Sequence, residues 1–202
     1  MKRVKTAVLI SGRGSNLQAL IDACADPNFP AEIVLVLSNV EGAGGLERAK
    51  QAGIATKTVS HKGFASREAF DAEIDATLRA GGIELVCLAG FMRILSDSFA
   101  RAWEGRILNI HPSLLPAFKG AHVHERALAA GVKMSGCTVH FVVPELDAGP
   151  IVEQASVPVL ADDTPETLAV RVLEQEHRIY PHALKLVAQG KVKLERGKAV
   201  FA

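Results

Sequence analysis

Cysteines, charge of one sign and long apolar runs are all scarce in this sequence of 202 residues. Its 23 basic and 22 acidic side chains leave a net charge of +1, so the basic excess of a typical nucleic-acid-binding protein is absent. No apolar run approaches the roughly 18 residues that span a bilayer, and the run after the basic N-terminus is too short for a signal peptide. The three cysteines, Cys24, Cys87 and Cys137, form no C-x-x-C pair, which predicts reduced, buried thiols. We therefore expect a cytoplasmic protein that binds neither nucleic acid nor membranes.

The length and composition predict one globular domain. At about 100–200 residues per domain, 202 residues suffice for a single sizeable core. Hydrophobic residues make up 49% and charged residues 22%, which is ordinary for a folded protein and excludes disorder as the default. No repeat, linker or low-complexity segment divides the chain. The regular alternation of apolar runs and helical patterns ends near residue 110. We therefore expect one domain (residues 1–202) with two lobes, about 1–110 and about 111–202.

Apolar runs alternate with helical patterns as far as residue 110. Continuous apolar runs such as residues 6–10 are typical of strands buried on both faces. Strands joined by helical crossovers form a doubly wound, mostly parallel sheet, so we predict an α/β, Rossmann-like fold. The expected strands are residues 6–10, 33–37, 54–59, 83–88 and 107–110, and the expected helices are about 16–25, 46–52, 66–80 and 96–103.

The second half follows a different pattern. Residues 138–143 and 151–159 read as two strands, and the connection 144–150 is too short for a crossover, which predicts an antiparallel extension of the sheet. Thr164 is expected to cap a long helix with Pro165 at its first position, and Pro181 to break or kink that helix. Residues 192–194 and 199–201 predict a terminal hairpin.

A glycine loop, Ser-Gly-Arg-Gly-Ser-Asn at residues 11–16, follows the first strand and opens the first helix. Backbone N–H groups and the helix dipole favour an anion at such a helix N-terminus, and Gly12 and Gly14 allow close approach. Leu17 replaces the third glycine of the dinucleotide fingerprint, and the Gly-Lys-Ser/Thr of the Walker loop is absent. A phosphate monoester therefore fits better than a pyrophosphate, and the alternative is a tight turn with a capping serine.

Polar side chains gather after the fifth strand. Asn109 and His111 alternate with apolar neighbours at its carboxyl end, where ligands of open parallel sheets bind. An amide donor and an imidazole could both act there on one reacting atom. Asp147 lies in the connection 144–150, and a carboxylate beside an imidazole would orient it. The alternatives are a turn-forming asparagine, a strand-end histidine and a solvated aspartate turn.

Zinc is a competing interpretation of some polar residues, because His122, His124, Cys137 and His140 are possible ligands. On a strand, however, Cys137 and His140 would point to opposite faces, and the two earlier histidines precede a helical run at 125–130. We therefore expect no metal.

Arg93 follows the fourth strand. Its neighbours Met92, Ile94 and Leu95 could line an apolar slot for a flat ring. The alternative is an arginine that only begins a helix.

Four segments occur in an order that identifies a family: SGRGSNLQA (11–19), LAGFMRIL (88–95), LNIHPSLLP (108–116) and ELDAGPI (145–151). Together they closely resemble the folate-dependent phosphoribosylglycinamide formyltransferases of purine biosynthesis, over nearly the whole chain from residue 8 to 181. The Asn-x-His-Pro-Ser run with a later aspartate is shared by formyltransferases in general, and the glycine loop narrows the resemblance to this branch. It implies formyl transfer from the cosubstrate 10-formyltetrahydrofolate to the amine of 5-phosphoribosylglycinamide.

The resemblance also implies a role for each matching residue. Asn109 and a protonated His111 would hydrogen-bond the oxyanion, and Asp147 would keep His111 charged and oriented, so these three residues are the expected catalytic trio. The phosphate would lie at Gly14, Ser15 and Asn16, and the ribose and glycinamide at Leu173, Glu174, Gln175 and Glu176. The folate would contact Arg67, Met92, Arg93, Ile94, Leu95, Asn109, Val143, Pro144, Glu145, Leu146 and Asp147. The first lobe would then bind the nucleotide and the second the folate.

Two rival functions stay open. One is another enzyme that uses 10-formyltetrahydrofolate, a methionyl-tRNA formyltransferase or a hydrolase, although these usually carry an additional domain. The other is a nucleotide-binding sensor with no activity, which would not need Asn109, His111 and Asp147 together. We expect small-molecule substrates and a monomer or homodimer, without metal.

Overall fold

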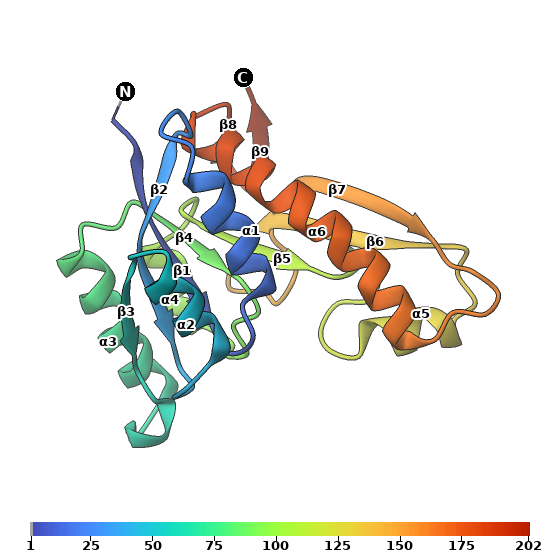
Figure 1. Ribbon diagram of the computed structural model, residues 1–202, viewed down its shortest axis with the longest axis horizontal. Coiled ribbons are helices and arrows are strands. Elements are labelled where there is room, and N and C mark those ends of the chain that lie inside the picture. Colours follow the sequence, from blue (N-terminus) through green and yellow to red (C-terminus); the bar gives the residue numbers. More distant parts are fainter. Residues whose placement is uncertain (1) are drawn as a thin grey trace.

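The structure is a computed structural model and describes residues 2–202. Sixteen elements follow one another along the chain (Figure 1). They are β1 (Val4–Ile10), α1 (Ser15–Cys24), β2 (Ala31–Ser38), α2 (Gly44–Gln51), β3 (Ala55–Thr58), the 3-10 turn η1 (His61–Gly63), α3 (Arg67–Ala80), β4 (Leu85–Leu88), α4 (Asp97–Ala102), β5 (Ile107–His111), α5 (Val123–Ala129), β6 (Met134–Phe141), β7 (Ile151–Pro158), α6 (Pro165–Ala188), β8 (Val192–Glu195) and β9 (Lys198–Phe201).

Seven strands form one sheet in the order β3-β2-β1-β4-β5-β6-β7. The first five are parallel, whereas β6 pairs antiparallel with both β5 and β7. The predicted α/β fold with an antiparallel extension is confirmed, as is the terminal hairpin of β8 and β9. Because the strand order reverses between β1 and β4, their carboxyl ends form the kind of crevice in which α/β proteins bind ligands.

Helices cover both faces of the sheet, as its apolar strands require. The core on one face includes residues of α1, α2, α5 and α6, and the core on the other face includes residues of α3 and α4. Strand β1 supplies alternate residues to each: Val8 and Ile10 to the first core, Ala7 and Leu9 to the second. Figure 1 shows α1 and α6 lying side by side over the first face.

The long helix α6 continues through Pro181, so of the two outcomes predicted there, a break or a kink, the break is wrong. Proline lacks the N–H that an α-helix needs at this position. Burial of apolar side chains on both sides of it, including Ile179 and Leu184, offsets the lost hydrogen bond. The fully buried Tyr180 adds a polar anchor, because its hydroxyl lies 2.9 and 3.1 Å from the carbonyl oxygens of Leu88 and Leu108.

The start of α6 agrees with the sequence. Thr164 accepts a hydrogen bond from the Thr167 amide and Pro165 is the first helical residue.

Strand β6 differs from the predicted strand: it begins at Met134 and ends at Phe141, so both of its ends lie earlier than predicted. Residues 134–137 pair with β7 although small and polar side chains hide the strand pattern there, and the chain leaves the sheet after Phe141 to form the connection to β7.

Gly149 lets this connection pass close to the end of β6. A methyl group on its Cα would lie 1.7 Å from the carbonyl oxygen of Phe141 and 3.4 Å from Nδ1 of His140. No side chain fits at this distance, so any larger residue must displace the backbone of the connection or of the strand.

We expect Gly149→Ala to lower the free energy of unfolding by about 1–3 kcal/mol, measured by urea denaturation, because the methyl group would overlap backbone. Gly63→Ala is the matched control, since nothing lies within 4 Å of a methyl group there. Equal denaturation midpoints for the two variants would contradict the close approach.

Candidate active site

A cavity of about 630 Å³ lies at the carboxyl ends of β4 and β5 and against the connection from β6 to β7. Most of the residues expected at the catalytic and folate sites line it together: Met92, Arg93, Ile94, Leu95, Asn109, His111, Val143, Pro144, Glu145, Leu146 and Asp147. Residues 120–125, which no sequence signal connected with folate, form another part of the wall. Segments far apart in the sequence therefore meet at one cavity.

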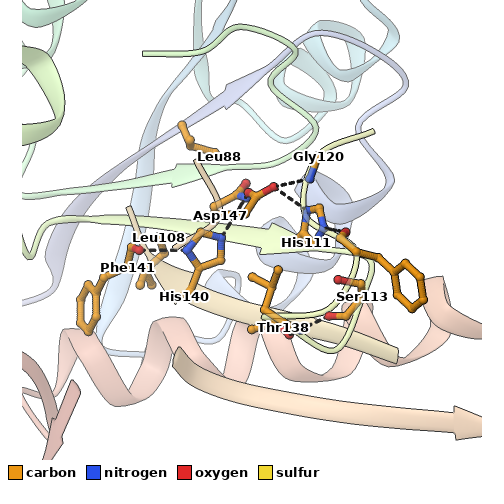
Figure 2. Close-up of polar contacts among 12 residues, drawn as sticks. Leu88, Leu108, His111, Ser113, Gly120, Thr138, His140, Phe141 and Asp147 are labelled. Atoms are coloured by element: carbon orange, nitrogen blue, oxygen red, sulfur yellow. Dashed lines mark hydrogen bonds and ion pairs between the residues drawn. The ribbon is translucent and has the colours of Figure 1, made fainter. Parts of the chain in front are cut away.

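Asn109 and His111 both come from β5 and Asp147 comes from the connection to β7. Two-residue spacing on a strand turns alternate side chains to the same face, which brings Asn109 and His111 to one cavity. The Asp147 carboxylate faces His111, and its Oδ2 lies 3.4 Å from Nδ1 of the histidine (Figure 2). Both side chains of this pair are only 7% exposed.

The backbone holds Asp147 in place. Its φ of 48° lies in the left-handed region, which is uncommon for a residue other than glycine. The Gly120 amide donates to Oδ2 of Asp147 at 2.9 Å. A solvated aspartate turn is therefore excluded, because the carboxylate is buried and hydrogen-bonded.

His140 is the site residue that the sequence did not reveal as such. It lies on β6 directly opposite Asn109, and its Nε2 is 3.2 Å from the Asn109 amide nitrogen and 3.8 Å from Oδ1 of Asp147. Its Nδ1 donates to the Phe141 carbonyl at 2.9 Å, so Nε2 is the acceptor in the neutral ring. Burial lowers the pKa of His140 and outweighs the opposing effects of that carbonyl and of Asp147, which favours this neutral form.

The other nitrogen of His111 is also occupied. Nε2 lies 2.9 Å from the carbonyl oxygen of Phe118, a residue with a φ of 53°. Both ring nitrogens thus face oxygen acceptors, and a ring protonated at both positions satisfies both. In this arrangement His111 has no N–H left for a substrate, whereas the sequence predicted one for the oxyanion.

The glycine loop and the middle of α6 form a second polar region. Gly14 has a φ of 75° and precedes α1, and the Asn16 amide donates to Glu176 at 2.8 Å. Glu176 is buried, and this burial raises its pKa against the opposing hydrogen bond from Asn16. Gln175 and Leu173 are half-buried and Glu174 is exposed. None of the residues expected at the phosphate and ribose lines the cavity that Asn109, His111 and Asp147 share.

The expected folate contacts are not all together. Arg67 is the exposed first residue of α3 and does not line the cavity. Arg93 does, with its guanidinium 5.8 Å from the centre of the Phe70 ring. The neighbouring Met92 and Ile94 are 77% and 53% exposed, so they form an apolar edge of the cavity.

Other kinds of site find no support within residues 2–202. No group of three histidine, cysteine or acidic residues in this range could hold a metal ion. The three cysteines are free and buried, and burial raises their pKa values to about 11 for Cys24 and about 12 for Cys87 and Cys137, so none is an activated nucleophile. No helix in the described part of the chain is long and apolar enough to cross a membrane.

Known proteins resemble this chain over nearly its full length. Phosphoribosylglycinamide formyltransferase of Escherichia coli (strain K12) is 50% identical over 192 residues, which cover 95% of this chain and 91% of that protein. The trifunctional purine biosynthetic protein adenosine-3 of Gallus gallus is 57% identical over 197 residues, but the chain spans only 20% of its length. The crystal structure of glycinamide ribonucleotide transformylase 1 from Symbiobacterium toebii matches with a TM-score of 0.95 at 47% identity, covering 98% of this chain and 94% of that one.

These relatives confirm the resemblance inferred from the four sequence motifs. The formyl transferase family itself matches residues 4–184, which include the strand that carries Asn109 and His111 and the connection that carries Asp147. The chain therefore belongs to the formyl transferase family.

Proposed function

We propose that this chain transfers the formyl group of 10-formyltetrahydrofolate to the amine of 5-phosphoribosylglycinamide, as a step of purine biosynthesis. The products are formylglycinamide ribonucleotide and tetrahydrofolate. The observation that carries the proposal is the convergence of Asn109, His111 and Asp147 at one cavity of a formyl transferase fold. The relatives named for this acceptor favour it over a methionyl-tRNA or water.

The reaction needs stabilisation of a charge on oxygen. The substrate amine attacks the formyl carbon, a C–N bond forms, and the carbonyl electron pair moves to oxygen. Asn109 uses one N–H toward His140, so its second N–H is available for this oxyanion. A donor of this kind contributes about 3–4 kcal/mol to lowering a barrier. His111 would add a positive charge when its ring carries a proton on both nitrogens, which face the Asp147 carboxylate and the Phe118 carbonyl.

A proton must then move from the attacking amine to N10 of the folate. The Asp147 carboxylate is the base we assign to this step, because His111 and Gly120 hold it in place while its Oδ1 is free of short contacts. When the tetrahedral intermediate collapses, the bond from carbon to N10 breaks and N10 takes up the proton. No covalent bond to the enzyme is needed, in agreement with the inert cysteines.

The two substrates would occupy different regions of the molecule. We assign the folate ring to the cavity between residues 92–95 and 143–147, whose exposed edge is apolar. Arg93 Nε is buried and has no hydrogen-bond partner among residues 2–202, so it can donate to a ring heteroatom. The phosphate is assigned to residues 14–16 and the ribose to residues 173–176, where Oδ1 of Asn16 also lacks a partner within that range.

The same proposal includes the setting in which the enzyme works. Residues 1–202 would act as one domain, with a nucleotide-binding lobe of about residues 1–110 and a folate-binding lobe of about 111–202. Both substrates are small molecules, and we place the enzyme in the cytoplasm as a monomer or homodimer.

The catalytic trio should behave as one unit. We expect Asn109→Ala, His111→Ala and Asp147→Asn each to lower kcat about 100-fold or more with little change in KM, measured with both substrates at steady state. The double variant His111→Ala/Asp147→Asn should be scarcely slower than the slower single variant, because each member of the pair acts through the other. Asn28→Ala and Asp97→Asn are exposed controls. Multiplicative losses in the double variant would contradict a shared role.

Glu176→Gln should weaken binding of the ribonucleotide but raise the stability of the fold. Because burial raises the pKa of Glu176, the folded state favours the protonated side chain. That contribution to stability is fully present below the pKa of the unfolded chain and is lost as pH rises through the higher folded pKa. Glutamine cannot ionise and can still accept from Asn16, so we expect a higher free energy of unfolding at pH 7 and a flatter pH dependence above about pH 4.5.

The same substitution should raise KM for the ribonucleotide about tenfold and leave KM for the folate unchanged, because an amide replaces one carboxyl oxygen at the ribose site and cannot make the same hydrogen bonds. Urea denaturation across pH and steady-state kinetics provide the two measurements. Glu104→Gln, an exposed carboxylate, is the control. Lower stability at pH 7, or an equal rise in both KM values, would count against the assignment.

A further inference from the structure

Four consecutive residues between β5 and α5 turn their main-chain groups to the catalytic pair and to one arginine. The Phe118 carbonyl accepts from His111 Nε2, and the Gly120 amide donates to Asp147 Oδ2. The carbonyls of the other two positions, Lys119 and Ala121, accept from Nη1 of Arg126 at 2.6 and 3.3 Å. Residues 118–121, which we call the strap, thus give the pair its second set of hydrogen bonds.

The strap is in a conformation that needs support. Phe118 has a φ of 53°, in the left-handed region that residues other than glycine seldom adopt, and Gly120 has a φ of 80°. Such a backbone persists only where surrounding contacts hold it. The preceding segment is fixed separately, because Oγ1 of Thr138 donates to the Ser113 carbonyl and accepts from the Leu115 amide.

Arg126 makes two hydrogen bonds to the strap from outside the catalytic pair. Its guanidinium bonds two carbonyls and also lies 5.7 Å from the centre of the Phe118 ring, so it contacts the segment at both ends. The Phe118 side chain also packs against the first core, but this contact does not orient the main chain of residues 119–121. A further contact is the ion pair of Lys119 with Glu145, whose side chains are 37% and 77% exposed. Exposed pairs of this kind contribute little.

We propose that Arg126 is a positioning residue for formyl transfer, which holds the strap so that the Phe118 carbonyl and the Gly120 amide fix His111 and Asp147. Arg126 touches neither partner itself and acts through the main chain of residues 118–121. Its own side chain is on the outer surface of α5. The effect on the rate rests on the proposed function, whereas the effect on the strap does not.

The test compares Arg126→Ala and Arg126→Lys with the exposed control Arg101→Ala. Arg126→Ala should lower kcat about tenfold or more, with both KM values within about twofold, because misplacing the pair affects the chemical step. Arg126→Lys should recover part of the loss, since an ammonium can still donate to one carbonyl. Arg101→Ala should match the parent protein.

Hydrogen–deuterium exchange of the free protein, followed by NMR, gives a second result that needs no substrate. In Arg126→Ala the Gly120 amide should exchange about tenfold faster or more, while amides of β5 and β6 keep the parent rates. An unchanged kcat, an unchanged Gly120 rate, or faster exchange throughout the chain would each overturn the proposal, as would an Arg126→Ala variant that does not fold. If the parent protein fails to transfer formyl groups, the exchange result alone decides the role of Arg126.

Discussion

A buried carboxylate constrains this structure more than any other single group. The Asp147 side chain is 7% exposed, and an ionised carboxylate so far from water costs several kcal/mol unless partners surround it. Its partners come from two separate places, His111 on β5 and the Gly120 amide on the connection to α5, while Asp147 itself lies on the connection from β6 to β7. The ionised carboxylate is therefore stable only when the parallel sheet, its antiparallel extension and the connection from β5 to α5 are all folded.

The change of direction at β5 makes this arrangement possible. Strand β5 is parallel to β4 but antiparallel to β6, so β6 begins beyond the carboxyl end of β5 and runs back along it, from Thr138 opposite His111 to Phe141 opposite Leu108. Strand β7 is antiparallel to β6, because the connection 142–150 is too short for the crossover that a parallel strand would need. This short connection brings Asp147 to His111 on β5, and the lack of a side chain at Gly149 lets the backbone pass the Phe141 carbonyl. The arrangement of the candidate site is thus a consequence of strand topology as much as of residue identity.

Helix α6 links the two polar regions of the molecule. Its buried Tyr180 lies within hydrogen-bond distance of carbonyls at the ends of β4 and on β5, while Glu176, one turn earlier, meets Asn16 of the glycine loop. A rigid helix between these contacts fixes the distance between the glycine loop and the strand that carries Asn109 and His111. The helix continues past Pro181 because the buried side chains on either side of the proline, Ile179 and Leu184, belong to the same core.

The sequence by itself determined the local elements and the family. Apolar runs and caps placed β1 to β5 and the start of α6, two-residue spacing put Asn109 and His111 on one face, and four motifs identified the formyl transferases. The roles assigned to the individual site residues stay predictions.

Only the tertiary structure paired His140 with Asn109, buried Asp147, kept α6 intact at Pro181 and placed the strap beside Arg126. Periodicity and caps depend on neighbours within a few residues, so one chain segment is enough to read them. Strand register, burial of a charge and a hydrogen bond to a distant carbonyl depend on contacts between segments that only the folded chain brings together.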